Sequence, residues 1–168
     1  MISGKVWGAT EAERDAPLPC DELEPRGLQT DRAISIDASP CVVYNWLCQL
    51  RVAPYSYDLL DNWGRPSPRE RDPQLTELEA GQEFMSVFRL ESFVLGRHIT
   101  LVSGRIAVTY AVRPEGVGSR LVVRTRFGTP RIVGHLLAFG DVFMARKQLL
   151  TLRELAEAEA KRAATGTE

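Results

Sequence analysis

Residues Tyr55–Pro66 read YSYDLLDNWGRP, a segment that combines aromatic side chains, carboxylates and turn-forming residues directly after an amphipathic helix. That helix is predicted to begin at Ser39-Pro40, because a serine cap followed by proline is typical of a helix start. A strand over Arg32–Asp37 precedes it, and a second, aromatic helix is predicted within Tyr55–Pro66. The apolar face of the first helix comprises Val42, Val43, Trp46, Leu47 and Leu50.

A loop rich in proline and an antiparallel sheet are predicted after this opening. The loop covers Gly64–Pro73, where three prolines disfavour regular structure. From Leu75 onward the apolar period changes to two, which is typical of strands, with Gly81 as a predicted turn. The turns between the later strands are short, which predicts antiparallel pairing. The predicted strands are 84–90, 97–102, 106–112 and 121–127, and one sheet face carries Phe88, Val108, Tyr110, Val123 and Thr125.

Four arginines fall on the opposite side of this predicted sheet, and we predict that they form a solvated face: Arg105, Arg113, Arg124 and Arg126. A nucleic-acid site would require aromatic residues between the basic ones and a basic domain overall. The net charge is -1 and the pI is about 6.2. We therefore predict no nucleic-acid partner.

A long C-terminal helix is predicted after Pro130, because apolar residues recur at helical spacing. Its stripe comprises Leu136, Phe139, Phe143, Met144, Leu150, Leu152 and Leu155. Gly140 interrupts the stripe, and a glycine inside a helix costs ~1 kcal/mol relative to alanine unless its missing side chain is used. Two explanations of Gly140 stay open: the helix packs tightly on the sheet at this position, or the missing side chain leaves space for a ligand.

The length and composition predict one α+β domain, since 168 residues with 44% hydrophobic content suffice for a single core. We expect an N-terminal extension over 1–30 packed on or near the domain, the domain itself over 31–160, and a flexible tail over 161–168. No apolar run approaches the ~20 residues of a membrane span, and the start lacks the pattern of a secretory signal. We therefore expect a cytoplasmic protein without stable membrane insertion. The sequence leaves open whether it forms a homodimer.

Residues with possible chemistry are few. Three cysteines, Cys20, Cys41 and Cys48, show no disulfide or metal spacing, so we predict reduced thiols, no metal and no cofactor. The weak catalytic candidates are Asp58, Asp61, His98 and Tyr110. The two aspartates are predicted to share one helix face. There, one carboxyl group could act as a general acid and the other as a general base in catalysis. Alternatively, the carboxylates stabilise the start of the helix through its dipole. His98 is predicted to face outward, and His135 lies near the start of the last helix.

The order of elements resembles the START-like, or SRPBCC, superfamily over about residues 31–158. The resemblance is carried by the turn at Ala38-Ser39-Pro40 with the helix after it, by Tyr55–Pro66 and by Trp7–Thr10. The last two segments are both similar to one bacterial branch of the superfamily. It implies a helix-grip fold, in which a curved antiparallel sheet wraps a long C-terminal helix after two short helices. The superfamily has seven strands, whereas about six can be delimited here.

The resemblance also implies a hydrophobic small-molecule ligand, such as a lipid, sterol or polyketide, held between the sheet and the last helix. A cyclase or dehydratase of polyketide type without a metal is an alternative, and a regulatory or interaction module is another. The residues expected to contact a ligand are Trp46, Tyr57, Trp63, Phe88, Val108, Tyr110, Val123, Thr125, Leu136, Phe139 and Phe143.

Overall fold

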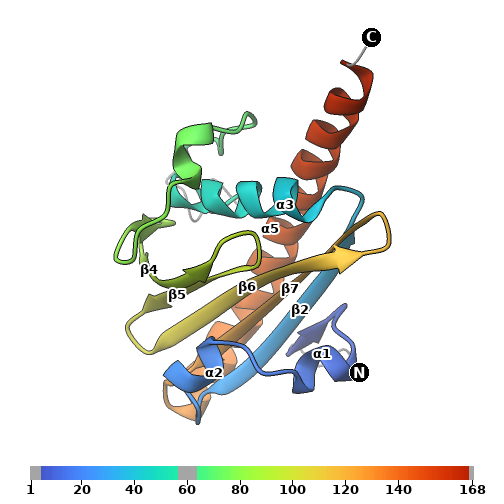
Figure 1. The fold of residues 1–168 in the computed structure, drawn as a ribbon. Helices are drawn as coiled ribbons and strands as arrows, with labels where there is room; N and C mark the ends of the chain where they lie inside the picture. The colour runs from blue at the N-terminus through green and yellow to red at the C-terminus, as the bar shows by residue number, and fades with distance from the viewer. Residues whose placement is uncertain (1–4, 57–63, 167–168) are drawn as a thin grey trace.

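The computed structural model describes residues 5–56 and 64–166, with the side chains of 131, 132 and 134–143 outside the described set. Within the described residues, seven strands form one curved, open sheet in the order β1-β2-β7-β6-β5-β4-β3 (Figure 1). Neighbouring strands are antiparallel except β1 and β2, which are parallel. The strands are β1 (Val6–Trp7), β2 (Leu28–Ile36), β3 (Glu83–Phe84), β4 (Phe88–Val94), β5 (His98–Ser103), β6 (Ile106–Glu115) and β7 (Gly118–Phe127).

The helices complete an α+β helix-grip fold, which confirms the predicted fold class. They are α1 (Glu11–Asp15), α2 (Cys20–Leu23), α3 (Pro40–Cys48) and α5 (Arg131–Thr165), with 3-10 turns η1 (Gln49–Arg51) and η2 (Pro73–Thr76). The Ser39 side chain caps α3 by accepting a hydrogen bond from the backbone N–H of Val42. The predicted aromatic helix within Tyr55–Pro66 falls mainly on 57–63, outside the described residues.

Strand register divides the sheet into an inner face toward α3 and α5 and an outer face toward α1 and α2. Val123, Tyr110 and Ile99 lie side by side on β7, β6 and β5, and all three belong to the main hydrophobic core. Leu149 and Leu152 of α5 join the same core. α5 packs chiefly along β2 and against α3, and Figure 1 shows β4 and β5 to one side of it. The alternation predicted for β6 and β7 is confirmed.

The start of strand structure predicted at Leu75 is wrong, because Leu75 lies in η2 and the next strand begins at Glu83. The strand predicted over 84–90 is also wrong, because the chain reverses there. Phe84 pairs with Phe88 across a tight hairpin between β3 and β4. Met85 and Ser86 make the turn with φ values of 51° and 62°, a conformation that side chains other than glycine rarely adopt. A register shift between Leu90 and Ser92 follows in β4, which brings Phe93 opposite Ile99 on the inner face. Simple alternation cannot reveal either irregularity.

The outer face corrects the prediction of solvated arginines. The side chains of Arg105 and Arg113 are 69% and 53% exposed, but those of Arg124 and Arg126 are only 2% and 11% exposed. Each of the five N–H groups of Arg124 has an acceptor at 2.7–2.9 Å. The acceptors are the carboxylates of Asp21 and Asp31 and the carbonyls of Glu13, Arg14 and Ala16. The end of α1 is therefore fixed to the sheet.

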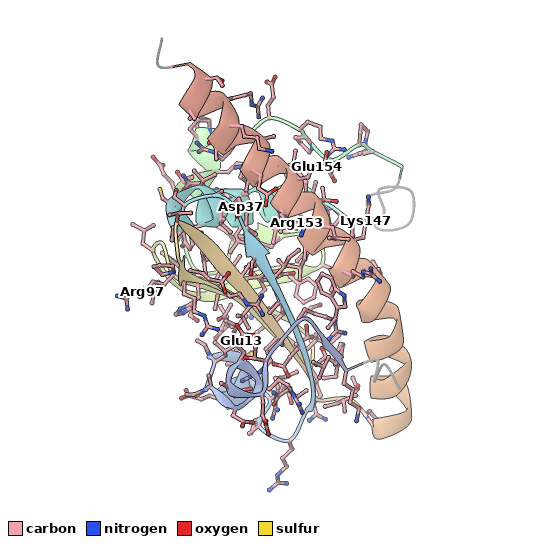
Figure 2. All side chains as sticks on the ribbon, turned by 90° about the vertical axis from the view of Figure 1, so that its right-hand side faces the viewer. Glu13, Asp37, Arg97, Lys147, Arg153 and Glu154 are labelled. Carbon is pink, nitrogen blue, oxygen red and sulfur yellow. The ribbon has the colours of Figure 1, made fainter. Side chains whose placement is uncertain are left out.

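Glu13 makes a second buried ionic cluster under the N-terminal segment. Glu13 is a residue of α1, and Figure 2 shows it across the sheet from α5. Its carboxylate accepts hydrogen bonds from Arg120 Nε at 2.8 Å and Nη2 at 2.9 Å, and from Arg113. The hydrogen bond from Arg120 lowers the pKa of Glu13 to about 2 against the opposing effect of burial. The N-terminal segment thus covers the outer face, with β2 beginning at Leu28.

At the other end of the chain, α5 continues to Thr165, into the stretch expected to be a tail. In the parts of the chain that the structure describes, no helix has the combination of length and apolar character that crossing a membrane requires.

Candidate functional site

A buried carboxamide lies on the inner face of the sheet. Gln148 of α5 is 5% exposed, and its Oε1 accepts a hydrogen bond from the Tyr110 hydroxyl at 2.8 Å. Its Nε2 donates to the carbonyl of Pro54 at 2.6 Å and to Met85 Sδ at 3.4 Å. One side chain of the last helix therefore joins the sheet, the β3–β4 hairpin and the chain that follows η1.

Residues with a strained backbone conformation lie close to this carboxamide. Tyr55, Met85 and Ser86 are the described non-glycine residues with positive φ. Met85 contacts Gln148 directly, and Tyr55 follows its partner Pro54 in the chain. Such conformations cost ~1–3 kcal/mol each and persist where the surroundings hold them, which is frequent at functional sites. Tyr55 is held by burial and by an edge-to-face contact with Trp46, with ring centroids 6.0 Å apart.

Apolar side chains flank Tyr110, the partner of Gln148 on the sheet. Val108, Val123, Ile99 and Leu101 are buried on the inner face of the sheet. Phe88 and Phe93 of β4 are only partly buried, and both pack against this core. Aromatic surface therefore stays accessible on the side of the inner face that lies away from β2. The arrangement suits an apolar molecule with a hydrogen-bonding group.

Several predicted ligand contacts lie on this inner face. Val108, Tyr110, Val123 and Thr125 face α5, and Thr125 pairs in register with Thr30 of β2. Trp46 is 1% exposed, so in this structure it is a core residue. The remaining predicted site residues cannot be placed: Tyr57, Asp58, Asp61 and Trp63 lie outside the described residues, as do the side chains of His135, Leu136, Phe139 and Phe143.

His98 is separated from this site by the sheet. It pairs with Ala111 on the outer face, whereas the adjacent Ile99 pairs with Tyr110 on the inner face. Burial lowers the pKa of His98 below its usual value. The structure therefore does not bring His98 to Tyr110.

The described cysteines and acids offer little for nucleophilic or metal chemistry. Cys20, Cys41 and Cys48 are free thiols, and burial raises the pKa of Cys48 to about 11, which disfavours the reactive thiolate. Among the residues that the structure describes, His, Cys, Asp and Glu side chains form no group of three suited to a metal ion.

A separate groove of about 500 Å³ lies at the β3–β4 hairpin and the turn after β5. Phe88 is the predicted site residue that lines it, together with residues such as Ser86, Arg89 and Ser103. The groove shares the strained hairpin with the Gln148 site.

Sequence reasoning missed Gln148, Met85 and Phe93. A glutamine beside an apolar helical stripe reads as a surface residue, and Met85 reads as a strand residue because its turn lacks glycine. The register shift between Leu90 and Ser92 in β4 places Phe93 on the inner face, where simple alternation from Leu90 would place it on the outer face. The one available signal was Tyr110, a polar interruption of an apolar row that requires a partner when buried.

No protein-family model matches the sequence, and no curated protein matches it. Solved structures share the fold at low identity. Protein SSP2350 from Staphylococcus saprophyticus is 12% identical with a TM-score of 0.55, over 79% of this chain and 94% of that one. KanY is 14% identical with a TM-score of 0.53, over 78% and 98%. Protein NE0264 from Nitrosomonas europaea is 13% identical with a TM-score of 0.52, over 86% and 99%. These likenesses show a shared fold.

Proposed function

We propose that the chain binds a hydrophobic small molecule of lipid, sterol or polyketide-like character on the inner face of the sheet, beside α5. The observation that carries the proposal is the Gln148 cluster, a buried hydrogen-bonding group in an apolar wall with strained backbone on two sides. Ligand sites in proteins are mostly apolar and contain a few placed polar groups. The helix-grip fold also supports our proposal that the chain is a START-like protein.

An enzyme of polyketide cyclase type is the second candidate. The observation in its favour is the Tyr110 hydroxyl, which lies on the inner face and is able to donate a proton or hydrogen bond to a bound carbonyl. Binding is favoured because the phenol and the carboxamide are both neutral near pH 7 and neither is a strong base. His98, the other weak candidate that the structure describes, lies on the outer face.

The test uses prodan, a fluorescent naphthyl ketone whose emission reports an apolar environment. Phe93 and Val94 are adjacent on β4, and both are partly exposed, but Phe93 packs on the inner core. Phe93→Ala should weaken prodan binding on the order of tenfold, because a phenyl contact is lost. Val94→Ala is the matched control and should leave the affinity within about twofold.

Equal loss in both variants, or no binding of prodan to the wild type, would contradict the proposal. Native mass spectrometry of the purified chain adds an independent readout. A co-purifying apolar molecule that is released on unfolding is the expected result.

A further inference from the structure

The carboxamide of Gln148 has one hydrogen-bonding position filled by a weak partner. A primary amide offers two N–H donors, and the first goes to the Pro54 carbonyl at 2.6 Å. The second goes to Met85 Sδ at 3.4 Å, and a thioether sulfur is only a weak acceptor. An oxygen acceptor arriving at the position of the sulfur would gain this N–H without disturbing the bond to Pro54.

The sulfur is also the partner best able to move. Met85 is the least buried of the three partners of Gln148, since Pro54 and Tyr110 are buried and Met85 is half-buried. Methionine is unbranched and adapts to irregular shapes. It also follows Phe84 at the start of the hairpin whose Ser86 and Phe88 line the groove described above. Displacement of the thioether therefore requires no change in the buried side of the cluster.

We infer that Gln148 donates this N–H to a carbonyl oxygen of the bound molecule, so the ligand is an apolar body that carries a neutral ketone, ester or lactone. The inference rests on the proposed function and specifies its ligand class. The three partners of Gln148 are a phenol, a prolyl carbonyl and a thioether, all of them neutral. A carboxylate in contact with these partners would lose its hydration without gaining a positive charge from them, which disfavours a free acid at this position. Arg32, a buried cation that pairs with Val123 on the same face, donates to the backbone carbonyls of Lys5 and Asp31.

The experiment compares two probes on the full chain. Prodan carries a ketone, and its analogue with a propyl group in place of the propionyl group lacks it. The wild type should bind prodan about fivefold more tightly than the analogue, because one net hydrogen bond distinguishes them. In Gln148→Met, which keeps the length and apolar volume of the side chain, the preference should vanish while the affinity for the analogue stays within about twofold.

Met85→Leu provides a second variant that leaves the buried bonds of Gln148 in place. Leucine keeps a similar volume but removes the sulfur acceptor, so the N–H has only the ligand as a partner. The preference for prodan should therefore rise by about twofold or more. This variant decides the question if Gln148→Met does not fold, which circular dichroism reports.

The outcomes separate the two proposals. If neither probe binds the wild type, both the proposed function and the carbonyl inference fail. If both probes bind equally, or if the preference survives in folded Gln148→Met or does not rise in Met85→Leu, the carbonyl inference is overturned while binding on the inner face stands.

Discussion

Val123 and Arg124 are neighbours on β7 and both are almost fully buried, yet they belong to faces of the sheet that are stabilised in different ways. On the outer face, each N–H of Arg124 has an oxygen acceptor. On the inner face, Val123 lies in register between the buried Arg32 of β2 and Tyr110 of β6, and the Tyr110 partner Gln148 gives one N–H to a thioether. The guanidinium of Arg124 has all its donors paired, whereas Gln148 has one donor with a weak acceptor, and this is the position where we propose that the ligand binds.

The largest expected effect comes from breaking the outer cluster. Arg124→Met leaves Asp31 buried without its cationic partner, and removal of one member of a buried ion pair costs ~3–5 kcal/mol. Urea denaturation of the folded chain measures this loss. Arg105→Met is the control, since that side chain is 69% exposed and should change stability by less than about 0.5 kcal/mol. A loss below about 1 kcal/mol in Arg124→Met would make the outer cluster dispensable.

The second prediction concerns the pH dependence of the outer face. Folding lowers the pKa of Glu13 from 4.5 to about 2, so its carboxylate stabilises the fold above the unfolded value and this contribution is lost as pH falls between these values. The contribution near pH 7 is ~3 kcal/mol. Glu13→Gln should therefore lower the free energy of unfolding at pH 7 and flatten its decline below pH 4.5. An unchanged pH profile would show that the cluster does not hold the segment.

The third prediction tests the chain crossing between the two faces. Trp7 packs against the inner core, and Cζ of Arg146 on α5 lies over its ring, 5.5 Å from the ring centroid. A few residues later, α1 begins on the outer face. Gly8 lies between them with a φ of 71°, and an added Cβ would meet the carbonyl oxygen of Ala33 at 2.2 Å.

Gly96 provides a matched control for this position. It has a φ of 72°, but an added Cβ would meet nothing within 4 Å. Gly96→Ala should cost ~1 kcal/mol from backbone strain alone, and Gly8→Ala should cost ~1–2 kcal/mol more because β1 must move away from β2. Thermal unfolding monitored by circular dichroism gives both values, and equal costs would argue against a close contact of β1.

The smallest expected effect is on the inner face. Tyr110→Phe removes one hydrogen bond to Gln148 and should cost ~1 kcal/mol in urea denaturation. A double-mutant cycle with Gln148→Met should give a coupling energy of ~0.5–1 kcal/mol. Additive losses would show that the two side chains do not interact.

Much of the fold could be predicted from the sequence because local rules act there without competition. The Ser39 cap fixes the start of α3, and short turns fix the order of β5, β6 and β7. The burial of Arg124 could not be predicted in the same way. An arginine at alternate strand positions looks the same whether water or another segment covers it, and the partners Glu13 and Asp21 lie about a hundred residues away.

The candidate site was predictable only where a polar residue interrupts an apolar row. Tyr110 gave that signal, and the structure supplies its partner in Gln148. The hairpin at Met85 depends on a backbone conformation that sequence preferences disfavour. Tertiary contacts, such as the bond from the Met85 N–H to the Leu50 carbonyl at 2.8 Å, impose it.

The central claim, that the inner face binds the ligand and the outer face is structural, is tested most directly by NMR of isotope-labelled valine methyl groups during titration with prodan. Val108 and Val123 lie on the inner face, and Val122 lies on the outer face of β7 beside Val123. The account predicts that the methyl signals of Val108 and Val123 shift with saturation while those of Val122 stay in place. A larger shift at Val122 than at Val108 and Val123 would contradict it.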